Sequence, residues 1–290
     1  MVRISDEAFA FLLIIPLIVF TSVLNVYPLL YSVWISFLKS TRPPLVFVGF
    51  DQYAKALQDP MFVNGIFVTL HFVADSIILS VLIGLGLALL MNRAFSGLGL
   101  VRAIFLLPWA ISEYATGLIW KFMYNTDIGF LNAVLSYTGL FSERVTWVTA
   151  GLGVETLAVA FAWHMAPLVA FFLLAGLQFI PRDLYKAAQV DGARVLRRFR
   201  SVTLPFLRYP LLIAVFLVTG SAARTLDIVF TLTRGGPSFT TSTMTNVIYI
   251  RTFQELNFSY GAALSVYLII IITCLCVGML VFMTRPMRSV

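Results

Sequence analysis

Long runs of uncharged residues decide what this chain can fold into. Residues 8–38 carry no charged side chain, and comparable apolar runs recur toward the C-terminus. A helix needs roughly 20 apolar residues to cross the hydrocarbon layer of a bilayer, so these runs are long enough to span it. Because 60% of the 290 residues are hydrophobic and only 11% are charged, we predict an all-α integral membrane protein.

The spacing of the runs predicts about six transmembrane helices in a single domain. Within residues 1–290, the expected spans are residues 8–38, 66–91, 103–124, 156–179, 209–232 and 258–284. An even number of spans puts both termini on one side of the membrane. That side would hold 12 of the 20 Lys and Arg residues but only four of the 13 Asp and Glu residues. Since cytoplasmic loops are rich in Lys and Arg, both termini are expected in the cytoplasm.

The most polar interruption of the apolar pattern lies at residues 181–205, between the fourth and fifth expected spans. Six cations stand there against two acids. Helical spacing of apolar and small residues predicts a first short helix, and Gly192 is expected to end it in a tight turn. A second amphipathic turn, ending at Leu204-Pro205, is expected to place Val195, Phe199 and Val202 on one stripe. The segment is therefore predicted to be a cytoplasmic helix-turn-helix that docks onto another protein.

This segment resembles the coupling loop, or EAA loop, of the permease subunits of ATP-binding-cassette (ABC) importers. The run that opens at Pro181 is similar to the carbohydrate-uptake branch of that family. The residues that the resemblance assigns to coupling with the ATPase are Leu184, Lys186, Ala187, Ala188, Asp191, Gly192, Ala193, Phe199 and Pro205. Lys186 stands where the family usually has Glu, so the contact at that point is expected to differ or to be lost. Charge alone would also allow a basic loop that lies on anionic lipid.

The resemblance implies a type I ABC importer permease in a prokaryotic cell (inner) membrane, with a cytoplasmic coupling loop. It implies a heterodimer with a second permease subunit, two ATPase subunits, and an extracellular or periplasmic solute-binding protein that delivers a sugar, oligosaccharide or polyol. The sequence holds no phosphate-binding Gly-x-x-x-x-Gly-Lys-Ser/Thr loop, so ATP and Mg²⁺ are expected on the ATPase. We therefore expect a transporter subunit without a cofactor of its own, surrounded by lipid. Its net charge of +7 is not taken as a sign of nucleic-acid binding.

Polar and aromatic side chains inside the expected spans are candidates for the substrate path, because ionisable groups at membrane depth are costly. These candidates are Asp75, Trp109, Glu113, Tyr114, His164, Arg224 and Asp227. Pro108 is expected to open the third helix near Glu113. Structural roles are the alternatives: an ion pair between Arg224 and Asp227, and a helix-packing bond for His164. With only two histidines in the chain, a multi-histidine metal centre is excluded and no metal site is expected.

Other functions remain open alternatives at this point. A permease for glycerol phosphate or another small polar solute would need more cations in the path than Arg224 supplies. A stand-alone secondary carrier would need paired inverted repeats, and residues 8–145 and 146–284 show no convincing repeat. An intramembrane enzyme is disfavoured because the sequence shows neither a zinc motif nor a Gly-x-Ser-x-Gly nucleophile elbow.

Overall fold

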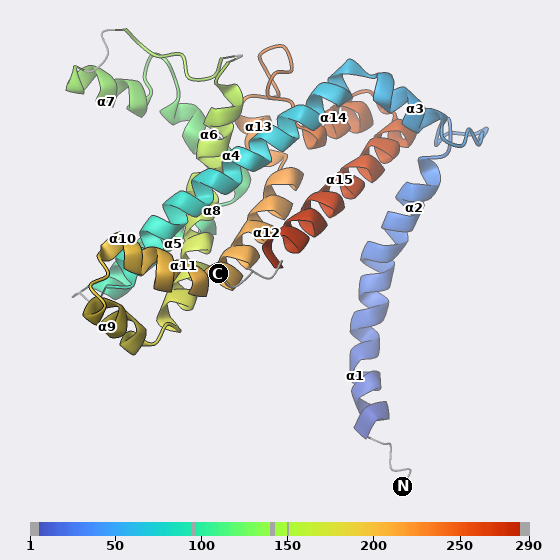
Figure 1. Ribbon diagram of the computed structural model, residues 1–290. Coiled ribbons are helices and arrows are strands. Elements are labelled where there is room, and N and C mark those ends of the chain that lie inside the picture. The colour runs from blue at the N-terminus through green and yellow to red at the C-terminus, as the bar shows by residue number, and fades with distance from the viewer. Residues whose placement is uncertain (1–5, 94–96, 140–142, 150, 285–290) are drawn as a thin grey trace. The chain divides into compact units, whose positions relative to one another are not determined.

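The computed structural model describes residues 6–93, 97–139, 143–149 and 151–284, and this part of the chain is almost entirely helical (Figure 1). Arg3, Arg285 and Arg288, which contribute to the charge count above, lie outside the described residues. The helices in chain order are α1 (Asp6–Thr21), η1 (Ser22–Val26), α2 (Tyr27–Ile35), α3 (Asp51–Gln58), α4 (Pro60–Met91), α5 (Leu98–Ala110), α6 (Glu113–Met123), α7 (Phe130–Thr138), α8 (Gly153–Gln178), α9 (Arg182–Val190), α10 (Val195–Arg198), η2 (Phe199–Thr203), α11 (Leu204–Phe206), α12 (Arg208–Arg224), α13 (Asp227–Leu232), α14 (Met244–Tyr249), η3 (Ile250–Gln254) and α15 (Phe258–Thr284). The predicted all-α fold class is confirmed.

The described helices supply up to six candidate membrane spans, as expected, but two of the six are broken. Four helices are long and apolar enough to cross a bilayer: Phe11–Ile35, Pro60–Met91, Gly153–Gln178 and Phe258–Val281. Two further candidates are helix pairs, α5 with α6, bent by 97°, and Val195–Phe206 with α12, bent by 68°. Helix ends differ from the expected limits by a few residues; α4, for example, begins at Pro60 instead of residue 66.

The break in the third span is formed by Ile111 and Ser112, the two residues between α5 and α6. Ile111 has extended backbone angles (φ −80°, ψ 142°), and Ser112 begins the next helix by accepting a hydrogen bond from the Ala115 amide at 3.3 Å. Pro108 lies in the last turn of α5, where its missing N–H weakens the helical ladder. The third span expected over residues 103–124 therefore consists of two half-helices, and the opening expected near Pro108 is confirmed.

The helix expected over residues 209–232 for the fifth span has a further break, separate from the 68° bend that precedes α12. It divides at Thr225, whose ψ of 129° is extended, into α12 and α13. The helix before it was expected to stop at Leu204-Pro205, and this is wrong, because helical backbone continues to Phe206. The π-helical turn η2, in which the Leu204 N–H bonds to Phe199 O, directly precedes Pro205. Such a turn changes the ladder spacing and lets proline follow without a break.

The described residues form two compact units, where a single domain had been expected. Of the described residues, the first unit comprises 6–63 with Ile248–Tyr267, and the second comprises those of Asn64–Val247 with 268–284. In the first unit, the Arg251 guanidinium bonds to Asp59 Oδ2 at 2.8 Å and to Glu255 Oε1 at 2.5 Å. Burial alone would lower the pKa of Arg251, but these two carboxylates outweigh it and raise the pKa above its ordinary value. The arginine therefore stays charged and joins η3 to the start of α4.

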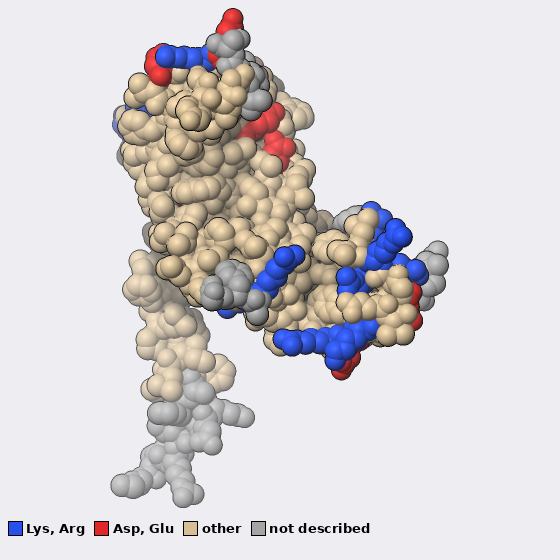
Figure 2. Space-filling model, turned by 90° about the vertical axis from the view of Figure 1, so that its left-hand side faces the viewer, with Lys and Arg blue, Asp and Glu red and all other residues tan. Residues whose placement is uncertain are grey.

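In the second unit, α4, α8 and α12 lie side by side, and α9 to α11 form a lobe at one end of them, opposite to α7 (Figure 1). Figure 2 shows Lys and Arg side chains gathered over this lobe, with few acidic side chains between them. The lobe is the predicted docking segment, residues 181–205. Its position at the end of a helical bundle agrees with a segment that lies outside the hydrocarbon layer.

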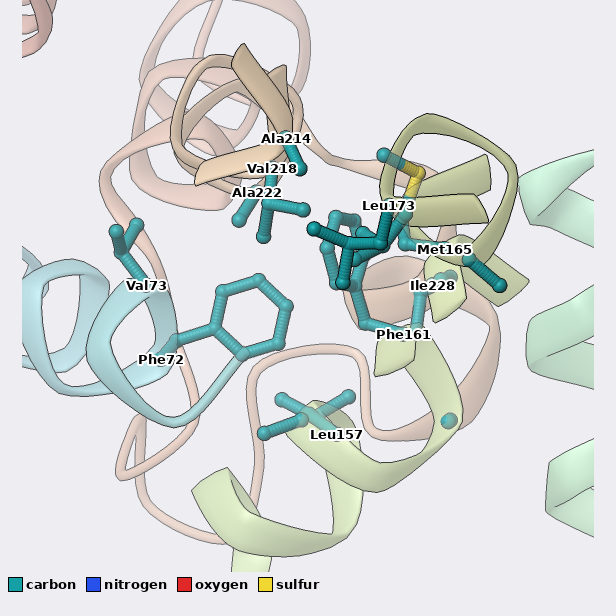
Figure 3. Packing of buried hydrophobic residues seen from close by; sticks show 14 of the residues in the cluster. Phe72, Val73, Leu157, Phe161, Met165, Leu173, Ala214, Val218, Ala222 and Ile228 are labelled. Atoms are coloured by element: carbon teal, nitrogen blue, oxygen red, sulfur yellow. The ribbon is translucent and has the colours of Figure 1, made fainter. Parts of the chain in front are cut away.

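The core of the second unit is built around α8, from which 18 residues are buried. Phe161 of α8 packs edge-to-face on Phe72 of α4, with ring centroids 5.5 Å apart. Val218 of α12 and Ile228 of α13 are fully buried in the same cluster (Figure 3). Because α8 contacts helices on several sides, it fixes the two broken spans, and with them the polar groups at their breaks.

Candidate functional site

The turn of the docking segment is built on a glycine in the left-handed region. The helix α9 starts after Pro181 and is capped at Asp191, and Gly192 follows with φ +72°. The Ala193 amide then bonds back to Ala188 O at 2.9 Å. This is a helix C-terminal cap of the type that favours glycine. The tight turn predicted at Gly192 is confirmed.

The docking segment exposes apolar side chains among its cations. Val190 is 88% exposed, and Val195 is 74% exposed. Leu184 and Leu196 are also exposed. The single apolar stripe expected for Val195, Phe199 and Val202 is only partly present, because Val202 is buried while Val195 faces outward. A basic surface with uncovered apolar side chains is typical of a protein-docking face.

A hydrogen bond holds the two parts of the docking segment together, and buried side chains attach the segment to the helices behind it. Tyr185 Oη lies 3.0 Å from Thr203 Oγ1, so α9 is bonded to η2. Val202 and Leu207 belong to the buried core. The exposed Lys186 donates to Asp183 Oδ1 at 2.8 Å, one turn away on the same helix. A surface pair of this kind contributes little to stability, so Lys186 stays available to another protein.

A hydrogen bond joins the breaks of the third and fifth spans. The Thr225 hydroxyl donates to Glu113 Oε2, and the two residues are 112 positions apart in the chain. Glu113 is the first residue of α6, and Asp227 is the first residue of α13. Carboxylates are favoured at the N-terminus of a helix, where the peptide dipoles leave a partial positive charge. The fold thus places two acids at the start of two half-helices.

The other candidates near this pair of breaks are largely uncovered. Tyr114 is 49% exposed and Trp109 is 43% exposed, while Arg224 and Asp227 are both exposed. The ion pair that was the structural alternative for Arg224 and Asp227 is not among the ion pairs of the described residues, and Arg224 Nε donates instead to Gly220 O at 2.7 Å. The helix breaks between the two residues, so their three-residue spacing does not place them on one face.

The other two candidates, His164 and Asp75, make different contacts, separate from the hydrogen bond between Glu113 and Thr225. His164 is only 7% exposed, and its Nδ1 lies 2.9 Å from Pro108 O, which corresponds to the structural alternative for this residue. Asp75 lies beside His71 and Glu155. Thr225 and Glu155 were not predicted from the sequence. Thr225 stands between two charged residues of one span, and Glu155 lies one residue before the expected start of the fourth span.

Comparison with known proteins assigns the chain to a family. Residues 80–285 match the family described as "Binding-protein-dependent transport system inner membrane component". A trehalose/maltose transport system permease protein of Thermococcus litoralis is 33% identical over 93% of this chain and 92% of its own length. A trehalose transport system permease protein of Mycobacterium tuberculosis is 32% identical over 91% of this chain and 85% of its own length. An sn-glycerol-3-phosphate transport system permease protein of Agrobacterium fabrum is 30% identical over 93% and 92%.

A solved structure supports the fold. A chain from the crystal structure of a bacterial ABC transporter involved in the import of alginate superposes with a TM-score of 0.80. The match covers 97% of this chain and 96% of that one at 20% sequence identity. A second structure of the alginate transporter, in complex with an alginate-bound periplasmic protein, gives a TM-score of 0.81 over 96% of this chain and 94% of that one, at 20% identity.

Proposed function

Because this chain belongs to the family of binding-protein-dependent transport system inner membrane components, we propose that it conducts a sugar, oligosaccharide or polyol. The chain is a permease of a binding-protein-dependent ABC importer in the inner membrane, and it is not a catalytic subunit. In the proposed assembly it forms a heterodimer with a second permease. Two ATPase subunits bind ATP and Mg²⁺, and an external solute-binding protein delivers the substrate.

The main support for a substrate path through this chain is that charged side chains are exposed at the Thr225 break of the fifth span. Arg224 and Asp227 are uncovered there, and Glu113 is bonded to Thr225 at the same level. A charged side chain that faces lipid at membrane depth is unfavourable by several kcal/mol. These groups therefore face a water-filled path, and the second permease subunit closes the other side of that path.

The chemistry of the path supports a neutral, hydroxyl-rich substrate. The carboxylates of Glu113 and Asp227 can each accept hydrogen bonds from hydroxyl groups. The half-exposed rings of Trp109 and Tyr114 offer apolar faces that suit a sugar ring. Arg224 is the cation beside the two acids, and a phosphorylated substrate would require several. Relatives named for trehalose and maltose support this choice, whereas the relative named for glycerol 3-phosphate supports the alternative.

The proposed role of the docking segment is to transmit movement of the ATPases. Its coupling residues are proposed to be Leu184, Lys186, Ala187, Ala188, Asp191, Gly192, Ala193, Phe199 and Pro205. The bond from Tyr185 to Thr203 makes α9 move with η2, and helical backbone continues from η2 through α11 to α12 with a bend of 68°. Closure of the ATPases would then shift α12 as a rigid body and change the access of the path.

Transport measurements with the partner subunits test this function. The chain is reconstituted into vesicles with the second permease, the ATPases and the solute-binding protein that its own genome encodes. We expect ATP-dependent uptake of a radiolabelled disaccharide such as trehalose or maltose, without competition by excess glycerol 3-phosphate. Preferred uptake of glycerol 3-phosphate would overturn the sugar proposal, and uptake by this chain alone without ATP would indicate a secondary carrier.

Substitution of Glu113 tests its place in the path. Glu113→Gln removes a charged acceptor, and a hydrogen bond to a charged group contributes about 1.5–3 kcal/mol. We expect uptake efficiency (kcat/KM) to fall roughly tenfold to a hundredfold, since 1.4 kcal/mol corresponds to a factor of about ten. Glu143→Gln, at an exposed position outside the spans, makes the same charge change and is expected to have no effect. If Thr225→Val lowers uptake as much as Glu113→Gln, Glu113 only holds the breaks together.

A further inference from the structure

Three metal-ligating side chains converge at the end of α8 that is farthest from the docking segment. His71 Nε2 lies 3.2 Å from Asp75 Oδ2 and 3.7 Å from Glu155 Oε1. One ligand atom from each of the three residues lies within 4.8 Å of the other two. His71 and Asp75 are one helical turn apart on α4, and Glu155 is in the first turn of α8. The cluster therefore joins two helices.

The spacing of the three atoms suits a small dication. Zn²⁺ binds imidazole nitrogen and carboxylate oxygen at about 2.0–2.2 Å in a tetrahedron, so its ligand atoms lie roughly 3.4 Å from one another. The two distances from His71 Nε2 are 3.2 and 3.7 Å. The side chain of Glu155 is 43% exposed, so it can rotate to complete the set. One imidazole with two carboxylates also leaves a fourth position for water.

Within the described part of the chain, His71 is the only ion-pair partner of the two acids. Among the ion pairs of the described residues, neither Asp75 nor Glu155 has a Lys or Arg partner, although the whole chain carries a net charge of +7. The Asp75 Oδ2 atom is buried, and the approach of His71 lacks the alignment of a hydrogen bond, so this oxygen has no such partner in the described part of the chain. A buried carboxylate oxygen without a donor is unfavourable, and a cation would satisfy it.

A pocket gives access to the cluster. It has a volume of about 490 Å³, and its lining includes His71, Glu155, Asn64 and Thr240. Glu155 stands in the first turn of α8, and the docking segment follows the last turn of the same helix. With the docking segment in the cytoplasm, the pocket opens toward the external medium. A metal ion can therefore reach the cluster without crossing the membrane.

We propose that His71, Asp75 and Glu155 form a binding site for a divalent transition-metal ion, with Zn²⁺ as the ion that suits the donor set. No metal site was expected, because the chain has only two histidines. Glu155 is 80 positions or more from the other two ligands in the chain, and only the fold brings the three together. A bound ion links α4 to α8 beside the outer pocket. This site is separate from the proposed sugar path and does not depend on it.

Metal titration of the purified full-length chain tests the site. The protein carries a tag without histidine, is treated with a chelator, and has Cys274→Ser and Cys276→Ser so that thiols cannot bind the metal. Calorimetric titration with Zn²⁺ is expected to show one ion per chain. His71→Ala, Asp75→Asn and Glu155→Gln are each expected to weaken binding by at least about tenfold, and Zn²⁺ is expected to raise the unfolding temperature of the protein with intact ligands only.

A control variant with the same charge change, placed away from the cluster, shows whether the loss of Zn²⁺ binding is specific to the three ligands. Glu143→Gln removes one acid from an exposed position away from the cluster and is expected to leave Zn²⁺ affinity unchanged. Binding of Zn²⁺ with unchanged affinity after His71→Ala would overturn the proposal, as would the absence of binding to the chelator-treated protein with all three ligands present. In either case the cluster is only an ion pair between His71 and its two acids. Because binding is read without transport, failure here leaves the proposed permease function untouched.

Discussion

Replacement of Gly192 by valine is expected to reduce uptake by at least about tenfold while the chain still inserts into the membrane. Gly192 has φ +72°, and no atom lies near a Cβ built at this position. The effect therefore comes from the backbone alone, because a β-branched residue is strained in the left-handed region by roughly 1–2 kcal/mol or more. Relief of that strain would reorient α9 against α10 and displace the coupling residues between them. Uptake, ATPase stimulation and co-purification of the ATPase measure the effect.

Two variants separate docking from a general loss of structure. Gly139 also has positive φ (+67°) with open space around it, and it caps α7 instead of α9. Gly139→Val introduces the same kind of strain and is expected to preserve uptake. Gly192→Asn should retain most of the activity, because asparagine tolerates the left-handed region. Normal uptake by the Gly192→Val protein, with the ATPase still bound, would show that this turn does not transmit coupling.

Gly117→Ala is expected to destabilise the protein by about 1–3 kcal/mol, the usual range for an overpacked contact. A Cβ at this position of α6 would overlap with Thr231 Oγ1 and lie 3.2 Å from the backbone Cα of Ile228, both on α13. Thr231 cannot easily move away, since its hydroxyl bonds to Asp227 O at 2.7 Å. The added methyl group must therefore push the two half-helices apart. The midpoint of thermal unfolding in detergent, measured together with uptake, reports the effect.

A second alanine substitution provides the control for this contact. Gly86 of α4 has no atom within 4 Å of a built Cβ, and alanine is a better helix former than glycine. Gly86→Ala is therefore expected to leave stability unchanged or slightly higher. Thr231→Ala added to Gly117→Ala should recover part of the loss, because it removes the overlapping hydroxyl. Equal unfolding midpoints for Gly117→Ala and the unaltered chain would contradict the close approach of α6 and α13.

The sequence alone predicted the all-helical membrane fold and the turn at Gly192, because both depend on local properties of the chain. The length of an apolar run decides whether a helix can cross the bilayer, and the conformational freedom of Gly192 permits the turn. Local rules also failed in identifiable places. Pro205 did not end its helix, because the π-helical turn before it changed the hydrogen-bond ladder. Pro108 indicated the opening in the third span, but the break at Thr225 was not predicted, because no proline or glycine lies within three residues of it.

The tertiary structure decided which polar groups meet. Glu113 accepts a hydrogen bond from Thr225, which is 112 positions away in the chain. His164 bonds to the carbonyl oxygen of Pro108, which is 56 positions away. Glu155 joins His71 and Asp75 from another helix. Inside a bilayer, a freed backbone group or a charged side chain has little water to bond with and must find its partner on a neighbouring helix. Hydropathy shows where a helix lies in the membrane, but helix packing determines which residues its polar groups face.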